Sequence, residues 1–341
     1  MMKSKLFWPI VVLLIILFIN LFFDKSFFSI EVRNGYLTGS LIDILNRGAP
    51  LLLVSIGMTL VIATKGVDLG VGSVIAMAGA VGAMTVSGAK GDSLLPLFTA
   101  IGLVIGISIL TGIWNGVLVS RIGVQPIVAT LILMVAGRGI AQLITDGQIM
   151  TVYYDPYTFI GGGYWLMLPF SIFIVAVVLI IASLLTRKTA LGLFIESVGT
   201  NPEASRLSGI NSKNILLMVY VFSGLCAGIG GLILSSNVAS ADGNNAGLWY
   251  ELDAILAVVI GGTSLNGGRF YLMGTVIGAL IIQSLTTTIY SIGIAPEINL
   301  VVKAVVVLIV CLLQSPEFRK KVFSVFSVKK AKEKSEGVSV S

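Results

Sequence analysis

The sequence predicts an all-α, polytopic integral membrane protein that crosses the bilayer about ten times. Its mean hydropathy is +1.01 and only 11% of its 341 residues are charged, less than half of the roughly 25% typical of soluble domains. The uncharged run 156–186 is longer than the roughly 20 residues that a helix needs to span a bilayer. Because an unpaired backbone amide is costly in lipid, the other apolar segments must also be helical.

The expected spans follow the apolar blocks in order along the chain. They are 7–23, 49–64, 72–86, 94–120, 127–144, 165–185, 215–238, 252–262, 271–285 and 298–314. The first block follows Lys3 and Lys5 as a secretory signal would, but residues 24–26 offer no small-residue cleavage site. We therefore expect this block to remain as a membrane anchor.

The positions of the basic residues predict the topology. Of the 22 Lys and Arg residues, sixteen fall on one side of the membrane and four on the other, and the last two lie within spans. The sixteen are Lys3, Lys5, Lys65, Arg121, Arg187, Lys188, Arg206, Lys213, Arg269 and the seven basic residues from Arg319 to Lys334; the four are Lys25, Arg33, Arg47 and Lys90. The positive-inside rule therefore places both termini in the cytoplasm.

Two Gly-rich breaks, 65–72 and 261–268, are flanked by the blocks 49–64, 72–86 and 252–262, which are too short to cross alone. Such breaks indicate transporter repeats with discontinuous helices that line a cavity. Tight turns between tilted helices are the alternative. Small residues four apart should let helices approach closely. These pairs are Gly102/Gly106, Gly112/Gly116, Gly224/Gly228 and Gly274/Gly278.

Several chemical classes are excluded by what the sequence lacks. It has no His, no phosphate-binding loop of the G-x-x-x-x-G-K-[ST] type, and no H-E-x-x-H or G-x-S-x-G motif. We therefore expect no enzyme activity of its own, no cofactor and no metal site. Cys226 and Cys311 lie in apolar stretches, so no disulfide is indicated. The pI near 9.3 reflects positive-inside charge, and no nucleic-acid partner is expected.

The two basic residues within spans are Arg138 and Lys303. Lys303 lies near the start of the last span, so its side chain is expected to extend to the interface. Arg138 lies between Gly137 and Gly139 toward the middle of its helix, where an arginine costs about 2.5–3.5 kcal/mol to insert. It should therefore have a partner, and a structural pairing is favoured over contact with substrate.

The cytoplasmic segment 186–214 has an unusual pattern. Asn201 and Pro202, followed by 203–207, predict a short capped helix with Pro202 in its first turn. Such a helix at the membrane surface is suited to dock on another protein, and a plain connector is the alternative.

Three stretches, 57–73, 196–211 and 251–265, resemble the permease subunits of bacterial ABC sugar importers of the ribose type, and the similarity covers almost the whole chain. The stretches 128–142, 185–196 and 242–249 resemble the galactofuranose permease branch. Lys65 and Gly70 depart from the family pattern. The resemblance implies a type II importer permease fold, with a transmembrane domain 1–314 that contains the coupling segment 186–214, and a basic tail 315–341.

The resemblance also implies the function and the partners. Two permease chains, identical or paralogous, would form a pore in the bacterial inner membrane, above two ATP-hydrolysing subunits, and an extracytoplasmic sugar-binding protein would deliver galactofuranose or a related pentose or hexose. Membrane lipid surrounds the pore. An ATP-independent secondary transporter of a small polar solute is the alternative, which should show buried carboxylates within its spans; the sequence shows none convincingly.

Candidate functional residues fall into two groups. The resemblance gives the coupling role to Glu196, Gly199, Asn201, Glu203, Arg206 and Gly209. The substrate path would use Asn244, Asn245 and Trp249, which offer amides and an aromatic face to a neutral sugar. The alternative is a capped turn at Asp242, with Trp249 in the interfacial belt. Asp68 and Asn115 would line the pore or satisfy nearby backbone, and the structural role is favoured.

Overall fold

The computed structural model describes residues 2–23, 27–33, 35–89, 93–293, 298, 300–305 and 308. The helices are α1 (Met2–Phe23), α2 (Ser40–Ala63), α3 (Val71–Val86), α4 (Leu95–Val117), the π-helical turn η1 (Leu118–Ile122), α5 (Pro126–Ile144), α6 (Asp155–Gly162), α7 (Phe170–Lys188), α8 (Leu191–Thr200), α9 (Pro202–Leu207), α10 (Ser212–Asn237), α11 (Tyr250–Ile260) and α12 (Leu272–Ser291). The strands are β1 (Glu31–Arg33), β2 (Tyr36–Thr38), β3 (Ile149–Thr151), β4 (Tyr164–Trp165), β5 (Leu168–Pro169) and β6 (Ser240–Asp242).

The predicted all-α, multi-pass fold is confirmed. Within the described residues, six helices are long and apolar enough to cross a membrane: α2, α4 with η1, α5, α7, α10 and α12. Every expected span from the first block to 271–285 coincides with a helix. In the last block, residues 300–305 are helical. The rest of this block, apart from residues 298 and 308, and the basic tail 315–341 lie outside the described residues.

Two expected boundaries were wrong. Helix α2 begins at Ser40 and has 24 residues, so the block 49–64 belongs to a helix that can cross alone. Hydropathy missed the first turns because they carry Asp43 and Arg47. The span expected at 165–185 begins later, because the β4–β5 hairpin occupies 164–169 and α7 starts at Phe170.

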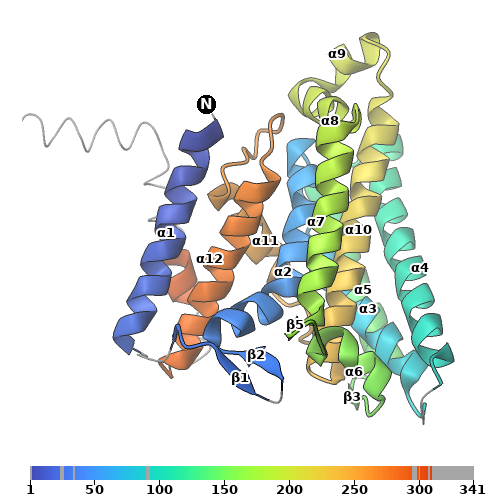
Figure 1. Ribbon diagram of the computed structural model, residues 1–341. Helices are drawn as coiled ribbons and strands as arrows, with labels where there is room; N and C mark the ends of the chain where they lie inside the picture. Colours follow the sequence, from blue (N-terminus) through green and yellow to red (C-terminus); the bar gives the residue numbers. More distant parts are fainter. Residues whose placement is uncertain are drawn as a thin grey trace, which may run out of the picture.

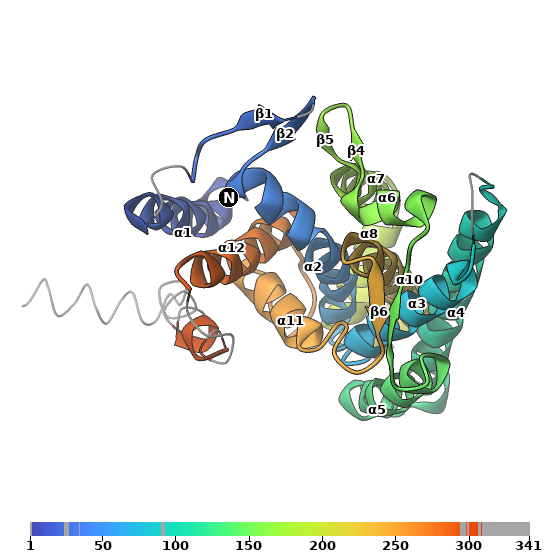
Figure 2. The same ribbon diagram turned by 90° about the horizontal axis from the view of Figure 1, so that it is seen from below.

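Helices α2 and α10 form the centre of the bundle, with α1, α11 and α12 on one side and α4 and α5 on the other (Figure 2). Glycines allow the closest helix contacts. A Cβ added to Gly224 would lie 2.5 Å from the Ser108 carbonyl oxygen, and one on Gly278 would lie 2.0 Å from that of Ala257. Among the described residues, no atom lies within 4 Å of a Cβ added to Gly102 or Gly106, so the expected close approach is not found at that pair.

The bundle has two distinct ends. The start of α1 and the helices α8 and α9 lie at one end, here called the α9 end, whereas β1, β2, β3 and α6 lie at the other, the strand end (Figure 1). At the strand end, β3 pairs antiparallel with β6, with Met150 opposite Ala241. This pairing joins two connections that are about ninety residues apart in the sequence.

Helices α3 and α11 are short, with 16 and 11 residues, and both begin inside the bundle. The Ser73 hydroxyl, in the first turn of α3, donates a hydrogen bond to the Leu133 carbonyl in the middle of α5. After β6 the chain turns inward and packs against the start of α3. A Cβ added to Gly72 would lie 2.5 Å from the Gly247 carbonyl oxygen and 2.3 Å from Glu251 Oε2. The first turns of the two half-length helices therefore meet within the bundle.

Candidate functional site

The predicted short helix in the segment 186–214 is present as α9. The Asn201 side-chain oxygen accepts hydrogen bonds from the backbone N–H groups of Glu203 and Ala204, both at 3.1 Å, which is the geometry of a helix N-cap. The Ser212 hydroxyl donates to the Pro202 carbonyl at 2.9 Å, so the start of α10 holds the start of α9. Gly209, at φ 86°, ends the helix. The position of α9 is therefore fixed by local hydrogen bonds.

Helix α9 presents charged and apolar side chains to solvent. Arg206 Nε lies 3.0 Å from Glu203 Oε2, and the two side chains are 68% and 76% exposed. Leu207 is 82% exposed. Glu196, on α8, is only half-buried, and its carbonyl accepts a hydrogen bond from the Thr200 hydroxyl. Of the predicted coupling residues, Glu203 and Arg206 thus form the exposed face, while Asn201 and Gly209 shape the helix.

The end of α8 contacts both Gly-rich breaks, and we call this contact the α8 junction. It is formed by Ala63, Lys65, Gly199, Thr200 and Gly268. The Gly268 N–H donates to the Ala63 carbonyl at 2.8 Å, and Lys65 Nζ donates to the Thr200 carbonyl at 2.9 Å. A Cβ on Gly199 would lie 1.8 Å from the Ala63 carbonyl oxygen. Segments from three distant parts of the sequence therefore meet where only glycine fits.

Asp68, within the first break, and Asn115, on α4, belong to one buried hydrogen-bond network. Asp68 is 3% exposed and Asn115 is 1% exposed. The Ser223 hydroxyl donates to Asp68 Oδ2 at 2.9 Å, and the Asn115 amide and the Gly70 N–H donate to Asp68 Oδ1 at 3.2 and 3.1 Å. Because a buried carboxylate needs such donors, this network ties the first break to α4 and α10. Neither residue lines the large cavity described next.

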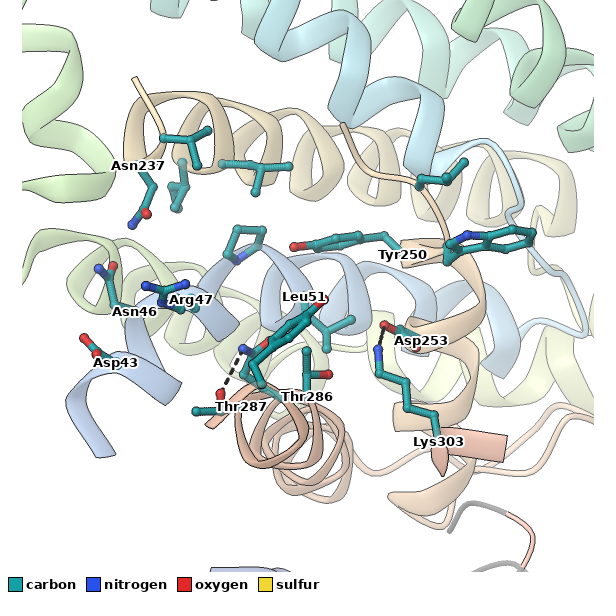
Figure 3. Close-up of a pocket in the computed structure, with 18 of the residues that line it drawn as sticks. Asp43, Asn46, Arg47, Leu51, Asn237, Tyr250, Asp253, Thr286, Thr287 and Lys303 are labelled. Atoms are coloured by element: carbon teal, nitrogen blue, oxygen red, sulfur yellow. Dashed lines mark hydrogen bonds and ion pairs between the residues drawn. The ribbon is translucent and has the colours of Figure 1, made fainter. Parts of the chain in front are cut away.

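A cavity of about 750 Å³ opens between α2, α10, α11 and α12 at the strand end (Figure 3). We call it the strand-end cavity. Its polar and charged lining comes from all four helices, and from the described residues after α12. The lining residues with polar or charged side chains are Ser40, Asp43, Asn46, Arg47, Asn237, Asp253, Gln283, Thr286, Thr287, Ser291 and Lys303, together with the aromatic residues Trp249, Tyr250 and Tyr290.

The predicted capped turn is present at Asp242. Its carboxylate accepts hydrogen bonds from the backbone N–H groups of Asn244 and Asn245, at 2.8 and 3.1 Å, and from the Asn245 amide at 2.8 Å. Burial opposes ionisation of Asp242, but these hydrogen bonds and the nearby Arg138 charge together hold its pKa below the ordinary value. Asn245 lines a second cavity of about 300 Å³, and Trp249 lines the strand-end cavity.

The two basic residues within the spans both have partners. Arg138 donates from its guanidinium to the Ala246 carbonyl, in the segment between β6 and α11, as expected of a structural pairing. Lys303 Nζ lies 2.7 Å from Asp253 Oδ2, so the expectation that it extends to the interface was wrong. The cost of an unpaired charge within the bundle explains both pairings.

Sequence reasoning missed the cavity and the buried acids. Asp68 and Glu251 are each 3% exposed, so the expectation of no convincingly buried carboxylate was wrong. Glu251 Oε2 has no hydrogen-bond partner among the described residues. The cavity amides of Asn46, Asn237 and Gln283 fall in three different helices. The one available signal was Lys303, because a lysine within a span that does not reach the interface needs a partner inside the bundle.

Comparisons with known proteins place this architecture in a family. A family model described as the permease component of branched-chain amino acid transport systems matches residues 40–311. The galactofuranose transporter permease protein YtfT of Escherichia coli strain K12 is 52% identical over 322 residues, which cover 93% of each chain. The fructose import permease protein FruF of Bifidobacterium longum strain NCC 2705 is 42% identical over 323 residues, 93% of this chain and 89% of that protein.

The ribose import permease protein RbsC of Haemophilus influenzae strain ATCC 51907 is 38% identical over 306 residues, which cover 89% of this chain and 90% of that protein. No solved structure matches the chain. The relatives favour a permease subunit over a secondary transporter or an enzyme. This chain therefore belongs to the family of ribose-type ABC sugar permeases.

Proposed function

We propose that this chain is the pore-forming permease subunit of an ATP-driven importer that carries a monosaccharide into the cytoplasm. The sugar is galactofuranose or a related pentose or hexose, since relatives that cover nearly the whole chain are named as galactofuranose, fructose and ribose permeases. The proposed partners are ATP-hydrolysing subunits, a second permease chain and an extracytoplasmic sugar-binding protein.

The α9 end faces the cytoplasm in this proposal. It contains the start of α1 and the helices α8 and α9 (Figure 1), and the sequence places most basic residues on this side. Both termini are then cytoplasmic, the membrane domain spans 1–314 with its coupling segment 186–214, and the tail 315–341 carries basic charge on the anionic inner surface. The strand end faces the side from which the sugar arrives.

The α8 junction is the observation that carries the coupling role. An ATPase subunit that docks on the exposed face of α9 would push on α8, whose end contacts Ala63 at the first break and Gly268 at the second. Since Gly199 leaves no free space at this contact, a rigid movement of α8 must displace α2 and the α11–α12 connection together. Coupling would therefore reach both half-length helices α3 and α11, which follow or precede the breaks.

The residues between β6 and α11 are the proposed inner part of the sugar path. Asn245 lines the cavity of about 300 Å³, and Trp249 lines the strand-end cavity. Asn244 donates weakly to the Gly147 carbonyl, at 3.4 Å, and its role is to hold the segment against the α5–β3 connection. The buried network of Asp68 and Asn115 supports a structural role for both residues.

The test is sugar-stimulated ATP hydrolysis by the reconstituted complex, with both Glu203→Gln and Arg206→Gln. The ion pair is exposed, so its loss costs at most about 1 kcal/mol of stability. We expect normal membrane insertion and loss of stimulation. Matched control substitutions are Glu31→Gln and Arg33→Gln, which remove an exposed pair at the strand end, 2.9 Å apart. Full stimulation in the α9 double variant would contradict the coupling role.

A further inference from the structure

We propose that the strand-end cavity is a binding site for a neutral monosaccharide within each permease chain, with Asn46, Arg47, Tyr250, Gln283 and Thr287 as its polar contacts. The inference rests on the proposed import of sugar and names a place where the permease itself holds it. The volume of about 750 Å³ lies within the range of about 300–1,000 Å³ for small-molecule sites.

The charges of the cavity favour an uncharged ligand. Four charged side chains line it: Asp43, Arg47, Asp253 and Lys303. They carry two negative and two positive charges, which cancel. Asp253 and Lys303 are already paired at 2.7 Å, with 16% and 11% of their side chains exposed, so neither is available to neutralise a ligand. An uncharged sugar leaves this balance of charge unchanged.

Several polar groups of the cavity have donors or acceptors that bond to no described residue. Asn46 accepts from the Ser171 hydroxyl through Oδ1, which leaves its amide nitrogen free to donate. Gln283 makes only a long 3.5 Å contact to the Thr287 hydroxyl. The Arg47 guanidinium has no hydrogen bond or ion pair with any described residue. These groups lie on α2 and α12, two neighbouring helices of the cavity wall, where Gln283 packs against Gly48 of α2.

An aromatic side chain completes the site. Tyr250 extends between α10 and α2, with its hydroxyl directed toward the wall that carries Asn46 and Arg47 (Figure 3). A pyranose or furanose ring has polar edges and apolar C–H faces, so one face can pack on the tyrosine ring while its hydroxyls reach the amides. If L-leucine were bound instead, its apolar side chain would leave the polar groups of the cavity unpaired, at a cost in affinity.

The site can be tested by cysteine protection, which does not depend on ATP hydrolysis. Thr287→Cys is introduced into the full chain with Cys311→Ser, in nanodiscs, and the rate of modification by a membrane-impermeant thiol reagent is measured. Cys226 is 1% exposed and provides the background. The probes are D-galactose, which supplies a furanose form, D-fructose, D-ribose and L-leucine. Tyr153→Cys is the control, since Tyr153 is 90% exposed and lies outside the cavity.

We expect one of the sugars to slow modification of Thr287→Cys roughly tenfold at about 90% occupancy, without effect on Tyr153→Cys. L-leucine should give no protection. Adding Gln283→Leu should raise the sugar concentration for half-protection by roughly tenfold, equivalent to ~1.4 kcal/mol, whereas Gln148→Leu, at an exposed turn, should leave it unchanged.

The outcomes separate this site from the proposed import function. Sugar uptake by the reconstituted complex without protection of Thr287→Cys by any sugar would overturn the site and leave the importer standing. Protection without ATP-driven uptake would support the site and count against the importer. Protection by L-leucine alone would overturn the assignment of a sugar as the ligand.

Discussion

Gly199→Ala should uncouple and destabilise this protein, because the α8 junction has no space for a side chain. The new Cβ would lie 1.8 Å from the Ala63 carbonyl oxygen and 2.7 Å from the Gly268 nitrogen, atoms that are themselves joined by a 2.8 Å hydrogen bond. Both neighbours are backbone atoms, so neither can move aside by changing a rotamer.

The expected loss can be estimated from the two effects. Overpacking of a tight contact costs about 1–3 kcal/mol, and loss of the hydrogen bond between Gly268 and Ala63 costs about 0.5–1.5 kcal/mol. We therefore expect Gly199→Ala to lower the free energy of unfolding by about 2–4 kcal/mol. An intact protein that survives this change should hydrolyse ATP with weak stimulation by sugar, because α8 no longer meets both breaks.

The assay is thermal unfolding in detergent, followed by a thiol-reactive fluorophore. In a Cys311→Ser background the dye reports exposure of Cys226, which is 1% exposed in the folded protein. Gly102→Ala is the matched control, since it also lies in the helical region but its Cβ would meet no atom within 4 Å. Equal unfolding temperatures for the two variants, together with unchanged ATPase stimulation, would refute the packing argument at the junction.

Two further substitutions test the buried charges. Lys303→Met leaves Asp253 charged and unpaired, so stability should fall by about 3–5 kcal/mol; adding Asp253→Leu should recover part of the loss, and additive losses in the same thermal assay would contradict a direct pairing. Arg138→Met removes the donor to the Ala246 carbonyl, which should cost about 1.5–3 kcal/mol and increase hydrogen exchange in residues 243–249; unchanged exchange there would show that Arg138 does not hold this segment.

The sequence alone determined the fold class and most of the topology. Its apolar blocks exceed the length needed to cross lipid, and lipid enforces helices wherever the chain crosses. The charge asymmetry predicts an orientation in the membrane. The pair Asn201 and Pro202 gave the start of α9, because an N-cap depends only on neighbouring residues. These properties are local, so they can be predicted from the sequence of one chain.

Only the tertiary structure decided which segments meet. Hydropathy reports how a segment partitions into lipid but not how each helix is rotated about its axis, and that rotation determines its neighbours. The contact of Gly199 with Ala63 and Gly268, the pairing of Asp253 with Lys303 and the cavity between α2, α10, α11 and α12 all join residues that are far apart in the sequence. A buried charge needs a partner and a close-packed backbone leaves no space for a side chain, so few arrangements of the helices are possible. Which of these arrangements forms depends on the packing of the whole bundle.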